Sequence, residues 1–410
     1  MNNQSVRIGI VGLGYVGLPL FCLFSKKYDC RGLDNDDKYV KTLQSGVDVR
    51  NCIIESELSI ALHHSKITTD WNLLRECNIY IVAVPTPVNK DKQPDFIHLK
   101  EACNALGIIL SRNDIVIFES TVYPGTTDEI CIPILEKVSG LVVNNDFFVG
   151  YSPERINVGD ELHRLDNVPK IVSASNQKTL AFVADLYKSV INSEIIRASS
   201  IKVAEAAKMY ENVQRDVLIA LANQYSDYCR EEGIDIQEVT DCAATKWNFS
   251  NVRPGLIGGH CIGVDAYYLL QRSAQKRVDL PLVITARSVN EKKAKQVSQR
   301  IISYVQSIYI DPRNVKILIL GFSYKANTPD IRNTMIATIV KSLSSTFITV
   351  DCFDPLVDSH VVESNYGIHM QDSDQLQLDK YDIVIKAVDH HVFDEFANTL
   401  PTMVDINLFL

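Results

Sequence analysis

A β-branched apolar run, Val6–Val11, leads directly into the glycine-rich segment Gly12–Gly17. A helical pattern follows at Leu18–Ser25, and a second strand pattern, Cys30–Leu33, ends at Asp34. A glycine pattern alone is weak evidence, but the order strand, glycine turn, helix, strand and acid restricts the chain to few folds. This order predicts a βαβ unit that holds a dinucleotide against a tight turn. A purely structural glycine turn is the alternative.

Each glycine of this turn has its own expected use. Gly12 makes the tight turn, Gly14 lets the backbone approach a pyrophosphate, and Gly17 lets the helix pack on the strand. The helix N-terminus adds amide donors and a positive dipole. Asp34 lies 22 residues after Gly12, where its carboxylate would bind a ribose diol and repel a 2′-phosphate. We therefore expect NAD rather than NADP, with contacts from Gly12, Gly14, Tyr15, Val16, Gly17 and Asp34.

Further strand patterns alternate with helical stretches, which favours a doubly wound parallel sheet. They lie at Ile79–Val84, Ile115–Phe118 and Phe147–Tyr151. In such sheets the ligand binds beyond the carboxyl ends of the strands. Polar groups follow these ends at Thr86-Pro87, Glu119-Ser120-Thr121 and Ser152-Pro153-Glu154-Arg155, although a structural account would accept any turn former there.

The second part of the chain repeats this architecture after a long helical pattern. Ser199–Glu232 contains neither proline nor glycine, and Gly233 ends it. Strand patterns follow at Val315–Leu320, Ile348–Asp354 and Tyr381–Val388, but only Gly321 stands where the first half has three glycines. We expect an α/β protein with two Rossmann-like doubly wound domains joined by a long central helix. The expected regions are 1–198, which binds NAD, 199–308, the connector and dimerisation region that carries the Cys261 loop, and 309–410, a second Rossmann-like domain.

The long helix also suggests an oligomer, because at 1.5 Å per residue it exceeds what one domain needs. Its apolar residues recur at three- and four-residue steps, which predicts one face buried in a homodimer or higher homo-oligomer. These residues are Val203, Ala207, Tyr210, Val213, Val217 and Leu221.

Cys261 follows the diglycine Gly258-Gly259, and Asp265 comes four residues later. A thiol at such a loop can attack a carbonyl carbon if its pKa is lowered or a base deprotonates it. A buried, inert cysteine is the alternative, since free cysteine usually behaves as a small hydrophobe. Beside a hydride acceptor, however, a nucleophilic cysteine indicates aldehyde oxidation through a thioester.

Composition excludes several classes of partner. The 410 residues carry a formal net charge of −9 without a long basic run, so we expect no nucleic acid. No apolar run approaches the ~18 residues of a membrane span, so we expect no membrane contact. The ten cysteines form no CxxC pair or zinc-type cluster, which favours reduced thiols in the cytoplasm and no metal.

In order and approximate spacing, six motifs resemble the UDP-glucose/GDP-mannose dehydrogenase family over essentially the whole chain. They are Gly12–Gly17, Glu119–Thr121, Ser152–Arg155, Ala204–Asn212, Gly258–Asp265 and Gly321–Arg332. The amino-acid sequence of Pro254–Asp265 most resembles the corresponding segment of the branch that oxidises UDP-N-acetylhexosamines (UDP-GlcNAc or UDP-GalNAc) for surface polysaccharide precursors.

The resemblance implies an NAD-dependent four-electron oxidation of a sugar nucleotide at C6, with residues 309–410 as the nucleotide-sugar (UDP) binding domain. Two hydrides leave to two NAD+, Cys261 carries a thiohemiacetal and then a thioester, and water releases the carboxylate. By the same resemblance Lys208 and Asn212 stabilise the oxyanion, Asp265 manages protons, Thr121 orients water and Glu154 serves hydrolysis. The substrate contacts implied are Glu154, Arg155, Ile156, Lys208, Asn212, Arg215, Lys246, Arg253, Gly258 and Lys325, and the further cofactor contacts are Thr86, Thr121 and Arg332.

Three positions depart from patterns found in the family. Val264 stands where some members have lysine, Val158 where others have a second glutamate, and Ala266 where this branch often has proline. The hydrolytic apparatus must then rest on fewer groups. A UDP-glucose or UDP-ManNAc 6-dehydrogenase is one alternative. A two-electron hydroxyacid dehydrogenase is another, and that class needs no cysteine. A non-catalytic nucleotide-sugar binding protein is the third, and it would be expected to lack Cys261 or Lys208.

Overall fold

The computed structural model describes residues 6–155, 165–260, 262–347, 349–394 and 403–410. The chain forms two compact units: unit 1 is Met1–Glu211 with Tyr267–Lys276, and unit 2 is Asn212–Ala266 with Arg277–Leu410. Within the described ranges, no helix combines the length and the apolar character that crossing a bilayer requires.

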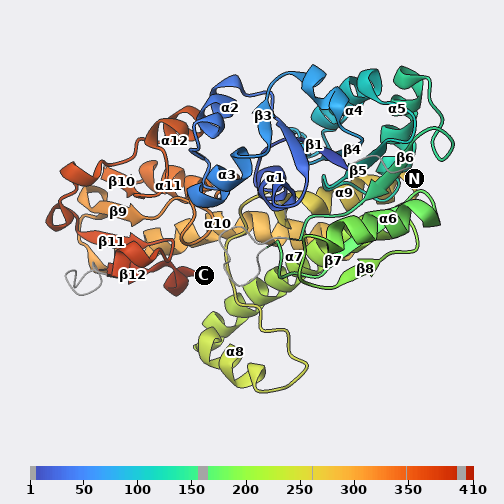
Figure 1. Cartoon of the computed structure of the whole chain (residues 1–410). Coiled ribbons are helices and arrows are strands. Elements are labelled where there is room, and N and C mark those ends of the chain that lie inside the picture. Colours follow the sequence, from blue (N-terminus) through green and yellow to red (C-terminus); the bar gives the residue numbers. More distant parts are fainter. Residues whose placement is uncertain (1–5, 156–164, 261, 348, 395–402) are drawn as a thin grey trace. The chain divides into compact units, whose positions relative to one another are not determined.

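Unit 1 is built on an eight-stranded sheet of order β3-β2-β1-β4-β5-β6-β7-β8 (Figure 1). The six strands from β3 to β6 are parallel and have the 3-2-1-4-5-6 order of a dinucleotide-binding fold. β7 then pairs antiparallel with β6, and β8 runs parallel to β7. The strands are β1 Arg7–Val11, β2 Asp29–Leu33, β3 Lys66–Thr68, β4 Ile79–Val82, β5 Ile115–Phe118, β6 Phe148–Tyr151, β7 Lys170–Ala174 and β8 Ile195–Arg197.

Helices cover this sheet on both faces, which explains why β4 and β5 are apolar at every position. Residues of α1, α2, α3 and α6 share one core with alternate residues of β1, β4 and β5. α4 and α5 contribute nothing to that core and pack against each other. The helices are α1 Gly17–Ser25, α2 Asp37–Gln44, α3 Glu55–Leu62, α4 Ile97–Ile109, α5 Ile132–Ser139 and α6 Gln177–Lys188, with shorter turns at Trp71–Glu76 and Thr127–Cys131.

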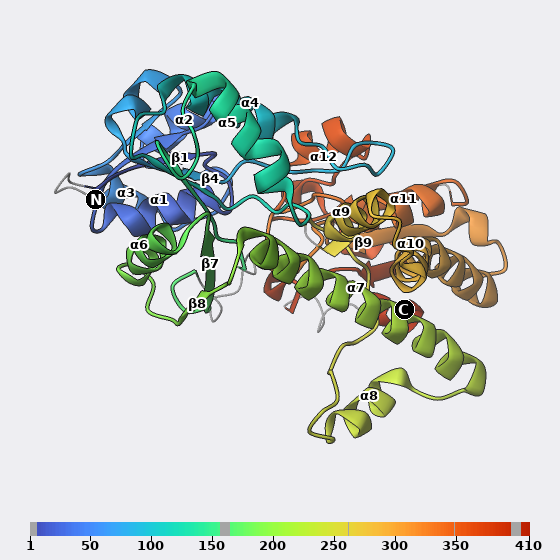
Figure 2. The same cartoon turned by 90° about the vertical axis from the view of Figure 1, so that its right-hand side faces the viewer.

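Unit 2 contains a second, smaller parallel sheet of order β10-β9-β11-β12. Its core joins this sheet to α10 and α11, while α8 stands apart from the sheet in both views (Figures 1 and 2). The elements are α8 Ile236–Ala244, α10 Pro281–Ile308, β9 Lys316–Leu320, α11 Ile336–Ser344, β10 Thr349–Phe353, α12 Ser359–Tyr366, β11 Ile383–Lys386 and β12 Met403–Asp405, with short 3-10 turns at Pro312–Asn314, Ser373–Gln375, Leu378–Lys380, His391–Phe393 and Ile406–Phe409.

Two helices belong partly to each unit: α7, Ile201–Glu232, and α9, Ile262–Gln275. The expected long helix is therefore present, and within a single chain part of the apolar face that was predicted to be buried in an oligomer is exposed. Val213 is buried, whereas Val203, Tyr210 and Leu221 are 48%, 73% and 60% exposed. The buried positions of α7 recur at helical spacing, and half of them are polar: Glu205, Lys208, Asn212, Asp216, Asn223 and Ser226.

The predicted fold class, two Rossmann-like α/β domains with a long helix between them in the sequence, is confirmed. The predicted strands agree with the observed ones to within a few residues at their ends. β3, β7, β8, α8 and β12 were not predicted. The antiparallel pairing of β6 with β7 also departs from the fully parallel sheet that was expected.

Candidate active site

The glycine turn of unit 1 has the shape that a dinucleotide requires. Gly12 adopts φ +89°, and a Cβ there would lie 2.7 Å from the Ala83 carbonyl oxygen. A Cβ on Gly17 would lie 1.7 Å from the Gly12 carbonyl oxygen, so α1 can start this close to β1 only at a glycine. A Cβ on Gly14 would meet nothing within 4 Å, which leaves open space at the position expected to face a pyrophosphate.

Asp34 stands directly after β2 and is nearly buried. Its Oδ2 accepts the Leu13 N–H at 2.9 Å, and its Oδ1 accepts the Asp36 N–H at 3.0 Å. These bonds fix the carboxylate beside the glycine turn, and each oxygen keeps a lone pair for a hydroxyl. The turn and the acid together fit NAD, with Tyr15 and Val16 partly exposed between the glycines.

The loops after β4 and β5 are tied together at the same edge of the sheet. Thr86 Oγ1 donates to the Thr121 carbonyl at 2.7 Å, and Ser120 Oγ donates to the Val84 carbonyl at 2.7 Å. Thr121 is thus held at the carboxyl end of β5, as expected for a residue that faces a ligand in this class of sheet.

Glu154 and Lys208 meet in unit 1, although 54 residues separate them. Lys208 Nζ donates to the Glu154 carbonyl oxygen at 2.5 Å and lies 3.9 Å from Glu154 Oε2, and both side chains are buried. Arg155, expected to face the substrate, pairs with Glu211 at 2.8 Å and donates to the Pro169 carbonyl at 2.9 Å.

Asn212 and Asp265 meet in unit 2, where Asn212 Nδ2 donates to Asp265 Oδ2. Both side chains are buried, at 4% and 2% exposure. Asn212 lies one helical turn after Lys208 on α7, and Asp265 lies in the first turn of α9. The predicted oxyanion donors therefore share a helix face, as the sequence spacing implied.

The loop before α9 is braced by amides that sequence reasoning missed. Asn223 donates from Nδ2 to the Gly255 carbonyl and accepts the Gly255 N–H at Oδ1, both at 3.0 Å. Asn290 receives another N–H of Asn223 at 3.1 Å and donates to Asp216 Oδ1 at 2.8 Å. In the sequence this network is marked only by two asparagines, Asn223 and Asn290, that lie within long helical stretches.

The diglycine lies tightly against the segment after β9. A Cβ on Gly258 would lie 2.4 Å from Tyr324 Cβ, so only glycine allows this approach. Gly259 donates its N–H to the Arg332 carbonyl at 2.8 Å, and Asn333 donates to the Gly259 carbonyl at 3.0 Å. Burial, with Arg332 nearby, lowers the pKa of His260 to about 4, so this imidazole is neutral at pH 7. Cys261 and Ile156 lie outside the described residues.

The remaining predicted contacts have varied surroundings. Arg332 pairs with Asp330 at 2.6 Å, and its side chain is 42% exposed. Arg253 donates to Gln237 at 2.5 Å and pairs with Asp241, both on α8. Lys246 and Arg215 are exposed. Among the described residues, no group of His, Cys, Asp or Glu has the arrangement of a metal site.

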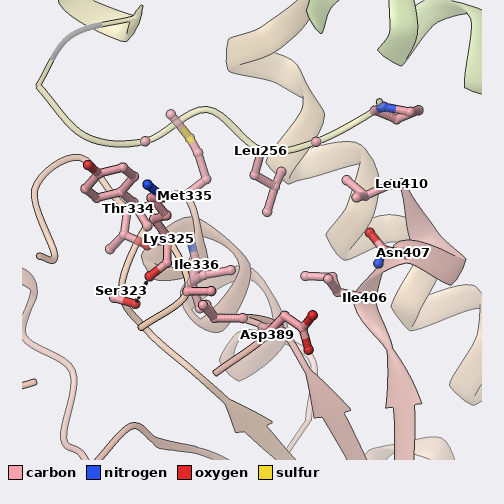
Figure 3. A pocket seen from close by; sticks show the side chains of 17 residues that line it. Leu256, Ser323, Lys325, Thr334, Met335, Ile336, Asp389, Ile406, Asn407 and Leu410 are labelled. Atoms are coloured by element: carbon pink, nitrogen blue, oxygen red, sulfur yellow. Dashed lines mark hydrogen bonds between the residues drawn. The ribbon is translucent and has the colours of Figure 1, made fainter. Parts of the chain in front are cut away.

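A cavity of about 250 Å³ in unit 2 lies between the diglycine loop and the small sheet, and residues of both line it. Figure 3 shows Leu256 over it, with Ser323 and Lys325 on one side and Asn407 and Leu410 on the other. Its lining combines apolar side chains with a few polar groups, as small-molecule sites do. The lining residues are Pro254, Gly255, Leu256, Gly258, Ser323, Tyr324, Lys325, Ala326, Thr334, Met335, Ile336, Ala387, Val388, Asp389, Ile406, Asn407 and Leu410.

The fold and the glycine turn together define a dinucleotide-binding α/β protein with a second, smaller Rossmann-like unit. Comparison with known proteins specifies the family. The NAD-binding, central and UDP-binding domain models of the UDP-glucose/GDP-mannose dehydrogenase family match residues 6–191, 202–292 and 318–409. The chain belongs to this family and is an NAD-dependent nucleotide-sugar 6-dehydrogenase that acts on a UDP-sugar.

Similar proteins cover almost the whole chain. UDP-N-acetyl-D-glucosamine 6-dehydrogenase of Salmonella typhi is 44% identical over 395 residues, 96% of this chain and 92% of that protein. The enzyme of the same name from Pseudomonas aeruginosa is 42% identical over 95% of this chain and 92% of its own length. A structure of UDP-D-ManNAc dehydrogenase from Pyrococcus horikoshii superposes with a TM-score of 0.87 at 29% identity, covering 98% of this chain and 95% of that one.

Proposed function

We propose that the protein oxidises UDP-N-acetylglucosamine at C6 to the uronate, using two NAD+ per sugar, to supply precursors of a surface polysaccharide. The observation that carries this substrate is the 44% identity over 395 residues to a UDP-N-acetyl-D-glucosamine 6-dehydrogenase. The cavity under Leu256 lies largely within the residues that match the UDP-binding domain, and we assign it to the nucleotide.

In the proposed reaction the C6 alcohol loses a proton and a hydride and becomes an aldehyde. The Cys261 thiolate adds to that aldehyde, and loss of a second hydride turns the thiohemiacetal into a thioester. Water cleaves the thioester, which releases the carboxylate and restores the thiol. Bound NAD+ supplies the hydride acceptor for each oxidation.

The chain's own groups suit these steps. Lys208 places a buried ammonium one helical turn from the Asn212 amide, and charge-assisted donors of this kind stabilise an oxyanion strongly. Asn212 holds Asp265 through one N–H and keeps a second for the substrate. With Val158 and Val264 at the departing positions, Glu154 is the carboxylate left for the hydrolytic step.

The thioester mechanism is tested by NADH stoichiometry and intact-mass spectrometry with UDP-GlcNAc. Cys261→Ala is expected to abolish acid formation, and Cys261→Ser to be severely impaired while accumulating a covalent sugar adduct. Cys242→Ala, at an exposed thiol on α8, is the matched control. Near-normal production of two NADH per sugar by Cys261→Ala contradicts the mechanism, and one NADH per substrate in the wild type favours two-electron chemistry.

A screen of UDP-GlcNAc, UDP-GalNAc, UDP-ManNAc and UDP-glucose tests the substrate. The highest kcat/KM is expected for UDP-GlcNAc. A UDP-glucose preference would leave the family and the NAD chemistry intact but overturn the proposed sugar.

We also propose a homodimer formed along α7. The exposed aromatic and aliphatic side chains at Tyr210, Leu221 and Tyr228 support it, since they would be covered by a second copy. Lys246 and Arg253 belong to the segment around and after α8 and are proposed to reach a substrate in the same or the neighbouring subunit.

A further inference from the structure

Behind Glu154, unit 1 contains a buried charge cluster that the proposed mechanism does not use. Glu119, directly after β5, has a fully buried side chain, and Lys170 at the start of β7 is 3% exposed. Lys170 Nζ lies 2.5 Å from Glu119 Oε2, and Tyr187 on α6 donates its hydroxyl to Glu119 Oε1. Burying two charges is unfavourable unless they are paired and fully hydrogen-bonded, so this cluster requires an explanation.

The same lysine reaches the turn that carries Glu154. Lys170 Nζ also donates to the Pro153 carbonyl oxygen at 3.2 Å, while Lys208 Nζ donates to the next carbonyl, that of Glu154, at 2.5 Å. Two buried lysines from separate elements therefore hold consecutive peptide carbonyls. The orientation of these peptides sets the direction of the Glu154 Cα–Cβ bond, so Lys170 is placed to influence the carboxylate through the backbone.

Glu119 and Tyr187 keep Lys170 in this position. Burial raises the pKa of Glu119, and the Lys170 ammonium opposes that effect. With Glu154 and Lys208 the cluster contains two acids and two bases, so the charges balance at the edge of the sheet. Ser152 Oγ donates to the Ile171 carbonyl at 2.7 Å and fixes the other end of the turn.

We propose that Lys170, supported by Glu119 and Tyr187, is a positioning residue that orients Glu154 for thioester hydrolysis. This rests on the proposed function, in which Glu154 serves the hydrolytic step. Lys170 then affects the last step of the reaction and neither hydride transfer, so the two oxidations continue at their normal rate when it is removed.

Pre-steady-state kinetics with UDP-GlcNAc and NAD+ separate this role from a general loss of structure. Lys170→Met is expected to keep a fast burst of up to two NADH per subunit and an unchanged kcat/KM for NAD+, because only the step after both oxidations is slowed. Its steady-state kcat falls by about 10- to 100-fold, the effect of misplacing a reacting group by about an ångström. Intact-mass spectrometry is expected to show an accumulated acyl-enzyme. Lys178→Met, exposed on α6, is the matched control and keeps wild-type kinetics.

A burst that shrinks in proportion to kcat, without acyl-enzyme, shows a structural role only and overturns the proposal. Lys170→Met removes the ion-pair partner of Glu119 and can misfold, so Glu119→Gln/Lys170→Met, which removes both charges, is measured beside it. Near-wild-type kcat in a folded double variant also overturns the proposal. If neither folds, Tyr187→Phe decides, because an unchanged hydrolysis rate there contradicts the network.

Failure of the proposed function gives a different result. A wild type that makes no NADH from UDP-GlcNAc refutes the substrate, and the variants are then compared on the UDP-sugar that it does oxidise. A wild-type burst of one NADH per subunit refutes the thioester sequence itself.

Discussion

Glu205 offers a direct test of how α7 holds the loop that follows Thr121. It is fully buried, and its carboxylate accepts the N–H groups of Gly125 at 2.5 Å and Thr127 at 2.9 Å. Burial raises the pKa of Glu205 from 4.5 to about 7, although both N–H groups oppose the shift. The folded protein therefore retains a proton that the unfolded chain releases above about pH 4.5.

The sign and size of the effect follow from this linkage. Because the folded pKa is raised, the stabilising contribution is complete below pH 4.5 and is lost as pH rises through about 7. A difference of roughly 2.5 pKa units corresponds to about 3 kcal/mol in the free energy of unfolding, with a slope near 1.4 kcal/mol per pH unit. Glu205→Gln cannot ionise, so this component should be absent from the variant.

Urea unfolding between pH 5 and pH 8 measures this difference. The two tryptophans, Trp71 and Trp247, lie one in each unit, so a Trp247→Phe background lets Trp71 fluorescence report unit 1. The free energy of unfolding of the wild type minus that of Glu205→Gln is expected to fall by about 2–3 kcal/mol over this range. Glu55→Gln, at an exposed acid of α3, is the control and should show little change. A difference that stays constant or grows with pH would refute the reasoning.

Three further predictions follow from the sites in each unit. Asp34→Asn is expected to reduce the ratio of kcat/KM for NAD+ over NADP+ by at least about fivefold. The reason is that the Asp34 carboxylate and a 2′-phosphate about 4 Å away repel each other by about 1 kcal/mol even in water. An unchanged ratio contradicts this role of Asp34. Asn223→Ala removes the hydrogen-bond partner of both the Gly255 N–H and the Gly255 carbonyl. It should lower the free energy of unfolding by about 2–4 kcal/mol and lower kcat, while the KM for NAD+ stays constant. Gln224→Ala, at an exposed neighbouring position, is the control. Light scattering at micromolar concentration should give a dimer, and Tyr210→Lys should weaken it; a monomeric wild type contradicts the proposed interface.

The NAD-binding unit could be predicted from local sequence because its constraints are local. The glycine spacing, the apolar strands and the acid after β2 all act within about 30 residues, and the structure confirms the fold they imply. The family comparisons confirm NAD and the class of enzyme that the motif order suggested. Strand β8 was missed because a three-residue, partly exposed segment carries little periodic signal, and β7 because only Ile171 and Val172 form an apolar run between Lys170 and Ser173.

The face of α7 illustrates the limit of pattern reasoning. Its apolar spacing correctly predicted a helix but did not indicate the polar residues that are buried within a single chain. Polar residues can share the buried face with apolar ones because another element supplies a specific partner, such as the Gly125 amide for Glu205 or the Glu154 carbonyl for Lys208. No periodicity encodes those partners.

By itself, then, the sequence determined the fold class, the cofactor and which residues are available for chemistry, since turns, strands and motif order depend on neighbours along the chain. Only the tertiary structure decided which of them meet. The Glu119–Lys170 pair joins residues 51 positions apart, and Asn223 reaches Gly255 across 32. Such pairs form because the packing of strands and helices excludes water there, and a buried charge or amide is then stable only beside a partner that the fold brings to it.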